Sequence, residues 1–267
     1  MSDEKSLKYN EPWILQRADP YVYRHTDGSY YFTASVPAYD GIVLRRAGTL
    51  AELSGAEEVM VWKKHESGPM SYHIWAPEIH YLFGKWYIYF AGGEAEDIWK
   101  IRPYVLECSG DDPLTDEWVE LGKMKRAAED EFSFEAFSLD ATVFENKGEY
   151  YYVWAEKVGV GKMISNLYIA KMESGNQLKT VQVLLTTPDY DWERKGFWVN
   201  EGPAVIHHDG KMFLTYSASE TGVDYCVGML SIDEDADILD PRLWKKERYP
   251  VLKTCEKLGI YGPGHNS

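Results

Sequence analysis

The sequence predicts an all-β fold built from a repeated strand unit. Four segments share one pattern, a turn with a glycine followed by a strand rich in aromatic and β-branched residues; they are residues 27–32, 83–90, 147–154 and 209–216. Runs of this composition, bounded by turn residues, are typical of β-hairpins. Their turn glycines lie 56, 64 and 62 residues apart, at Gly28, Gly84, Gly148 and Gly210. The chain therefore contains an internal repeat.

The length of the repeat favours a β-propeller. A unit of about 60 residues exceeds the roughly 40–50 residues of many propeller blades, but longer loops account for the difference. The second unit begins at Ala76-Pro77-Glu78, and a fifth opens at residues 261–267, where the sequence given stops. We therefore expect a single domain over residues 1–267, truncated at its C-terminal end, with a fifth blade that is incomplete.

Three acidic residues recur at similar places in the repeat. Asp19, Asp140 and Glu201 each precede a short apolar stretch, a turn and an aromatic strand. Taken singly, an Asp before Pro initiates turns, and a Glu before Gly-Pro can end a strand. Asp140 stands between apolar residues, where an unpaired carboxylate is costly to bury. Together, their matched positions predict carboxylates gathered into one catalytic site.

Charge and composition exclude several partners and suggest a location. The chain has 28 basic and 43 acidic residues, a net charge of -15, which argues against nucleic acid or an anionic membrane as partner. Residues 1–6 are charged, and no stretch approaches 18 uninterrupted apolar residues. The three cysteines, Cys108, Cys226 and Cys255, show no disulfide or zinc-site spacing. These observations predict a cytoplasmic protein that acts on a neutral substrate.

Five segments in order resemble the motif set of glycoside hydrolase family 43: residues 17–20, 73–78, 138–141, 200–203 and 262–267. The resemblance spans residue 13 to the last residue. It implies a five-bladed β-propeller that hydrolyses arabinose- or xylose-containing plant polysaccharides with inversion and without an organic cofactor. The first two segments look most like the α-L-arabinofuranosidase members.

The resemblance also implies roles for the acids. Inversion requires one carboxylate that deprotonates water and one carboxylic acid that protonates the leaving oxygen, about 6.5–9.5 Å apart. Asp19 is then the base and Glu201 the acid. Asp140 would orient Glu201 and raise its pKa, because the acid must stay protonated near neutral pH.

Further contacts are predicted less directly. Trp75 is a candidate stacking wall for a furanose ring, although a core tryptophan is the alternative. Ser138 and Asn166 are candidate hydrogen-bond donors to sugar hydroxyls. The resemblance implies that His265 lies on the propeller axis beside a structural ion, such as calcium, which would be coordinated mostly by water.

Three classes of function remain open, two of them implied by the resemblance. The first is an α-L-arabinofuranosidase that releases terminal arabinose from oligosaccharides of arabinan or arabinoxylan. The second is a β-xylosidase or an enzyme with both activities. The third is a non-catalytic sugar-binding propeller, since a fold alone does not decide function. Endo-acting arabinan hydrolysis also stays open.

Overall fold

Hairpins with tight turns organise the chain, and they lie where the turn glycines predict them. Gly28, Gly84, Gly148 and Gly210 have φ between 73° and 90°, a conformation that glycine adopts without steric penalty. Each glycine lies between the first two strands of an antiparallel group. The computed structural model describes residues 12–160 and 162–267, and within them it confirms the predicted all-β class.

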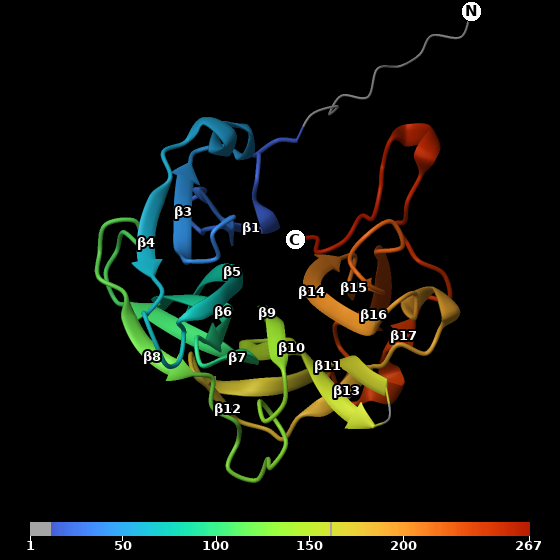
Figure 1. The fold of residues 1–267 in the computed structure, drawn as a ribbon. Helices are drawn as coiled ribbons and strands as arrows, with labels where there is room; N and C mark the ends of the chain where they lie inside the picture. The colour runs from blue at the N-terminus through green and yellow to red at the C-terminus, as the bar shows by residue number, and fades with distance from the viewer. Residues whose placement is uncertain (1–11, 161) are drawn as a thin grey trace, which may run out of the picture.

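Four groups of strands follow one another along the described residues (Figure 1). The first contains β1 (Ala18–Arg24), β2 (Tyr30–Ser35), β3 (Gly41–Ala47) and β4 (Val59–Lys63). The second contains β5 (Tyr72–Leu82), β6 (Lys85–Glu94), β7 (Asp97–Cys108) and β8 (Val119–Lys123). The third contains β9 (Ser138–Asn146), β10 (Glu149–Val160) and β11 (Lys162–Ser174), with β12 (Gln177–Leu178) and β13 (Val183–Thr186) paired to β11. The fourth contains β14 (Trp198–His208), β15 (Lys211–Ala218), β16 (Cys226–Asp233) and β17 (Lys245–Lys246).

Short helical turns are the other regular elements of the described chain. They are the 3-10 helices η1 (Leu50–Gly55), η2 (Asp191–Glu193), η3 (Pro241–Leu243) and η4 (Glu256–Leu258). Across the described ranges, no helix has the length and apolar character needed to cross a membrane.

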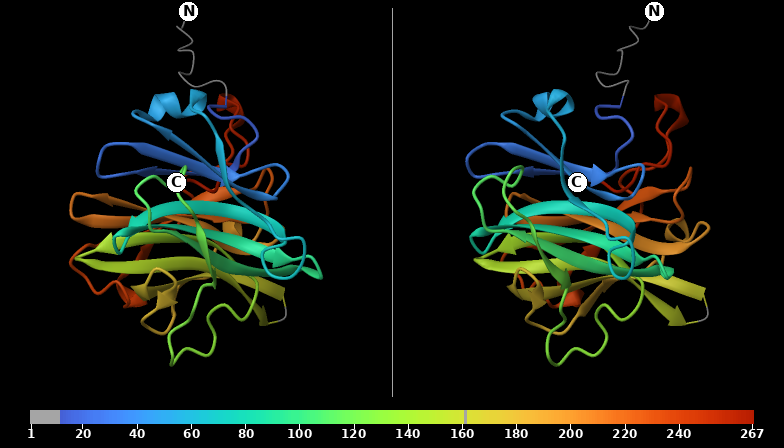
Figure 2. Two further views of the ribbon diagram at one scale, coloured as in Figure 1. Left: turned by 90° about the vertical axis from the view of Figure 1, so that its left-hand side faces the viewer. Right: turned by 60° about the vertical axis from the view of Figure 1, so that its left-hand side comes forward.

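The strand groups surround a common centre. In Figure 1 the first strands of the groups, β1, β5, β9 and β14, lie nearest the middle of the view, and the C-terminus lies among them. A parallel pairing of Ile164 with Trp198 joins the third group to the fourth. Figure 2 shows the first group (blue) directly beside the second (cyan to teal), and β1 and β2 both contact β5.

Neighbouring groups share apolar cores, which hold them face to face. Ile42 and Leu44 of the first group pack with Ile79 and Ile88 of the second. Other cores join the second group to the third, through Tyr89 and Tyr152 among others, and the third to the fourth, through Val153, Leu167, Leu214 and Tyr216.

Each innermost strand carries a residue with left-handed backbone where its pairing shifts register. These residues are Asp19, Ala76, Asp140 and Gly202, with φ of 51°, 45°, 51° and 53°. A non-glycine residue in this region is uncommon and concentrates at functional sites. The bulges interrupt the in-and-out alternation of side chains along each strand. Two of the predicted site residues, Asp19 and Asp140, therefore occupy the bulge itself.

Glu201 lies one residue before its bulge, so its place in the repeat differs from that of the two aspartates. The equivalent residues of the second and third groups are Trp75 and Leu139. The expectation that all three acids occupy one repeat position is therefore corrected by one residue for Glu201. The shift turns Glu201 to the same pocket as Trp75 and Leu139.

Candidate active site

Asp19 and Asp140 meet around one histidine. His265 Nδ1 lies 3.2 Å from Asp19 Oδ1 and 3.8 Å from Asp140 Oδ2. The other oxygen of Asp19 accepts a hydrogen bond from Ser35 Oγ at 2.6 Å. The Asp19 carboxylate is thus held on one side by Ser35 of β2 and on the other by His265 of the C-terminal segment.

Glu201 lies beside this pair of aspartates. The backbone N–H of Gly202 donates to Asp140 Oδ2 at 3.2 Å, which fixes Asp140 next to the residue that follows Glu201. Tyr225 donates its hydroxyl to Glu201 Oε1 at 2.8 Å. Because this bond engages one carboxyl oxygen, the other oxygen is available to carry a proton toward a bound molecule.

The protonation of these groups is set by burial and by their mutual repulsion. Burial raises the pKa of Asp140 to about 8, and the charges of Glu201 and Asp19 act in the same direction against the attraction of His265. Burial also raises the pKa of Glu201, although Tyr225, His265 and Lys157 oppose the shift. A carboxyl group whose pKa is raised is suited to general acid catalysis.

Burial and the neighbouring charges shift the pKa of His265 in opposite directions. Burial alone would lower the pKa of its imidazole, but the carboxylates of Asp140, Asp19 and Glu201 raise it above its usual value. A protonated ring offset by neighbouring carboxylates keeps the cluster near charge balance, which lowers the cost of burying acids together.

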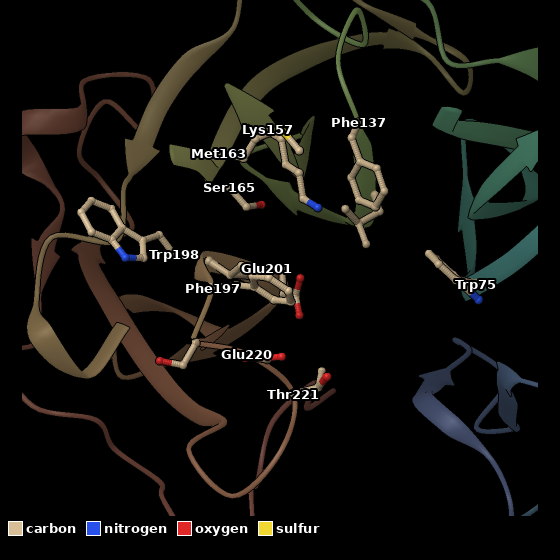
Figure 3. A pocket seen from close by; sticks show the side chains of 13 residues that line it. Trp75, Phe137, Lys157, Met163, Ser165, Phe197, Trp198, Glu201, Glu220 and Thr221 are labelled. Atoms are coloured by element: carbon tan, nitrogen blue, oxygen red, sulfur yellow. The ribbon is translucent and has the colours of Figure 1, made fainter. Parts of the chain in front are cut away.

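A pocket of about 280 Å³ opens over Glu201 (Figure 3). Its wall is largely apolar, and its lining includes Trp75, Phe137, Leu139, Lys157, Met163, Phe197 and Glu201. Figure 3 shows Trp75 across the cavity from Glu201, with the Lys157 amino group pointing inward beside Phe137. An apolar cavity with a few polar groups converging on it is typical of a small-ligand site.

The three predicted substrate contacts are placed differently. Trp75 is half-buried and lines the pocket, as expected for a stacking wall. Ser138 is fully buried and donates its Oγ to the carbonyl of Ala136 at 2.8 Å. Asn166 is buried and donates its amide to the hydroxyl of Tyr168 at 3.1 Å. Neither Ser138 nor Asn166 is among the pocket-lining residues, because both side chains are directed into the protein, so this geometry does not support their predicted sugar contacts.

Sequence reasoning missed several groups that act on the acids. Lys157 holds its Nζ 3.8 Å from the centroid of the Phe137 ring, and burial lowers its pKa although Glu201 opposes the shift. Tyr225 and Ser35 bind Glu201 and Asp19 directly. None of the three stands in a local motif. The one available signal was the pairing of Ser35 with Ala18 across the predicted β1–β2 hairpin.

The metal expectation for His265 is compatible with an ion held mainly by water. Among residues 12–160 and 162–267, no cluster of three or more His, Cys, Asp or Glu side chains is arranged to hold a metal. Next to His265, Asn266 leaves its Oδ1 buried without a hydrogen-bond partner. Calcium takes six to eight oxygen ligands, so these residues fit a hydrated ion and not one enclosed by protein.

A cluster of carboxyl groups, one of them lining a pocket and two of them with raised pKa, is typical of glycoside hydrolases. The family model described as "Glycosyl hydrolases family 43" matches residues 9–267. The chain belongs to family 43 of the glycosyl hydrolases, as its sequence motifs suggested.

Relatives with known names are similar over nearly the whole chain. An extracellular exo-α-(1→5)-L-arabinofuranosidase of Streptomyces avermitilis is 49% identical over 98% of this chain and 53% of its own length. A protein of the same name from Streptomyces chartreusis is 47% identical over 97% of this chain and 77% of its own length. The crystal structure of an α-L-arabinofuranosidase from Lactobacillus brevis, 51% identical, superposes with a TM-score of 0.87 over 96% of this chain and 79% of that one. The chain thus spans about half the length of the S. avermitilis relative.

The predicted cytoplasmic location is wrong. Both Streptomyces relatives are named as extracellular proteins. The prediction relied on the charge of residues 1–6, which lie outside the described residues, and on the three cysteines, which are free thiols. Neither observation determines where the protein is located. A secretory leader is recognised independently of the fold, and a few free thiols are tolerated in many environments.

Proposed function

We propose that this protein is a glycoside hydrolase that releases terminal α-L-arabinofuranose from oligosaccharides derived from arabinan or arabinoxylan. The observation that carries the proposal is the clustering of Asp19 and Asp140 beside Glu201, which lines the pocket. The arabinofuranosidase names of relatives 47–51% identical support the choice of sugar. Their exo-acting names support removal of terminal residues.

The proposed reaction is a single displacement with inversion. Asp19, oriented by Ser35 and His265, removes a proton from the attacking water. Glu201 gives its proton to the departing glycosidic oxygen, and its raised pKa supports this role. Asp140 accepts the backbone N–H of Gly202 and so holds the residue that follows Glu201, which orients the acid, while burial and the charge of Asp19 favour its protonated form.

The backbone supports a five-bladed propeller as the complete architecture. Ser35 Oγ accepts the N–H of Ala76, the bulge residue of the next group. Ser217 Oγ accepts the N–H of His265, whose φ is 44°. His265 thus repeats the contact and the conformation of a bulge residue, which supports the proposal that the segment around it acts as the innermost strand of a fifth blade.

A hydrated divalent ion near His265 is part of the proposal. When bound, it would add positive charge near the carboxylates and so stabilise the ionised form of Asp19, the proposed base. Elemental analysis after mild dialysis is expected to find about one divalent ion per chain. His265→Ala should lose that ion, and a metal-free protein with full activity would contradict the assignment.

Hydrolysis of two 4-nitrophenyl glycosides tests the proposed activity. The wild-type protein should release 4-nitrophenol from the α-L-arabinofuranoside and much less from the β-D-xyloside. Comparable rates would favour a dual enzyme, and a preference for the xyloside would favour a β-xylosidase. No release by folded protein, together with sugar binding, would favour a non-catalytic propeller.

The role of Glu201 as the acid is tested by comparing substrates whose leaving groups differ in their need for protonation. Glu201→Gln should lower kcat on an arabino-oligosaccharide by about 10²–10⁴. The same variant should affect the aryl glycoside less, because 4-nitrophenolate needs little help from an acid. Glu129→Gln, a change in an exposed loop, is the matched control and should keep wild-type rates on both substrates.

A further inference from the structure

A row of aromatic rings leads away from the catalytic pocket. Trp75 lines the pocket, and the ring of His73 lies 4.2 Å from it, centroid to centroid. The ring of Trp99 follows at 5.1 Å from His73 and 6.3 Å from Trp75. Trp99 is 60% exposed although tryptophan usually buries most of its surface. We call these three side chains the aromatic shelf.

The shelf is mounted on two strands, with Trp75 at a register shift of β5 and Trp99 on β7 where the β6–β7 pairing is irregular. Trp75 of β5 pairs with Ala91 of β6, and the hairpin of β6 and β7 carries Trp99. A Cβ atom added at Gly93 would lie only 2.7 Å from the carbonyl oxygen of Ile98, so the two strands approach closely just before Trp99. This close approach constrains the backbone before Trp99, and the contact of its indole with the His73 ring limits the positions of the side chain, which lowers the entropy cost of binding to it.

The surroundings of the shelf are suited to a neutral polyhydroxylated chain. Burial lowers the pKa of His73, so the central ring is uncharged at neutral pH. A hollow of about 130 Å³ lies beside it, lined by Ala38, Tyr39, Lys64, Tyr72 and His73. Lys64 donates to the carbonyl of Ser71 at 2.9 Å and has further N–H donors for a hydroxyl group. Ring faces for C–H surfaces and donors for hydroxyls are therefore adjacent.

We propose that the aromatic shelf binds the leaving chain of an arabino-oligosaccharide, at sugar residues beyond the one directly linked to the terminal arabinose. The inference rests on the proposed function, because it assumes that the terminal residue occupies the pocket over Glu201. Trp75 belongs to both features, so a chain leaving the pocket past Trp75 meets His73 and then Trp99. The substrate class that this favours is linear α-linked arabino-oligosaccharides of three or more residues.

Dependence of the rate on chain length tests the shelf. The quantity measured is the ratio of kcat/KM on arabinotetraose to kcat/KM on arabinobiose, which has no residue beyond the first of the leaving group. For the wild-type protein this ratio should exceed one. Trp99→Ala should lower it about tenfold, as expected for loss of a central aromatic contact. Trp99→Phe, which keeps a ring, should restore part of it, and Tyr249→Ala, at a 71% exposed tyrosine outside the shelf, should leave the ratio at the wild-type value.

The outcomes distinguish failure of the shelf proposal from failure of the proposed function. If the wild-type protein hydrolyses neither oligosaccharide nor the aryl arabinofuranoside, the proposed function fails. If it hydrolyses them and the ratio is unchanged in Trp99→Ala, the shelf proposal is overturned while the function stands. Equal losses on both oligosaccharides would also overturn it, because they would place Trp99 in the pocket or in folding.

Discussion

Replacing Asp140 by Asn should change how stability depends on pH. Burial raises the pKa of Asp140 to about 8 in the folded protein, whereas an unfolded Asp titrates near 3.9. Between these values the folded state holds a proton that the unfolded state has lost. Stability from this group is therefore present at low pH and is lost as pH rises toward 8.

The size of the effect follows from one proton. Between pH 5 and pH 6 the Asp140 contribution to the free energy of unfolding of the wild-type protein should fall by about 1.4 kcal/mol. Asp140→Asn removes this contribution. His265 adds little in this window, because its raised pKa keeps it protonated when folded and an unfolded histidine is still largely protonated below about 6.5. Glu201 contributes in both proteins and cancels in the comparison.

Urea denaturation of both proteins at pH 5 and pH 6, in chelator-treated buffer, measures the difference. The stability of Asp140→Asn relative to wild type should increase by about 1.4 kcal/mol between the two pH values. Asp111→Asn, at an exposed loop residue, is the matched control and should show the wild-type trend. Parallel trends in wild type and Asp140→Asn would refute the claim that Asp140 is protonated in the folded state.

Three other substitutions test separate contacts. Lys157→Met should move the basic limb of the pH profile of kcat/KM to higher pH, because Lys157 lowers the pKa of Glu201. Lys157→Arg keeps the positive charge and should leave the limb unmoved. An unmoved limb in Lys157→Met would show that Lys157 does not affect the pKa of Glu201. Glu193→Ala should cost about 3–5 kcal/mol in urea denaturation, because the buried Tyr216 hydroxyl loses its acceptor and Lys246 loses one of its two carboxylate partners. A loss below about 1 kcal/mol would show that the network relaxes. Gly202→Ala should cost about 1 kcal/mol or more in thermal denaturation, because φ is 53° and the new Cβ would lie 3.2 Å from His265 Nδ1; unchanged stability and kcat would show that the site has room.

The strands and the acids could be predicted because their signals are local. Turn glycines such as Gly84 and Gly148 mark each hairpin within a few residues, and their conformations agree with that reading. Asp19, Asp140 and Glu201 stand within short motifs that repeat along the chain. The structure links all three through His265 and Gly202, as a shared site requires.

The directions of the other side chains and the contacts to the acids could not be predicted, because they depend on bulges and on packing between strand groups. Bulges at Asp140 and Gly202 break the two-residue alternation, so the direction of Ser138 could not be read from its position in the strand. Tyr225 reaches Glu201 from 24 residues further along the chain, and Lys157 reaches the pocket from β10. Such contacts arise from the packing of strand groups and carry no spacing of their own.

Proton NMR of the first sugar released tests the central claim most directly. The claim is that Asp19 and Glu201 hydrolyse an α-arabinofuranosyl bond by single displacement at the pocket over Glu201. The wild-type protein acting on arabinotriose should release β-arabinofuranose first, with the α-anomer appearing only as mutarotation proceeds. Initial release of the α-anomer would mean retention through a covalent intermediate and would contradict the roles assigned to both carboxylates.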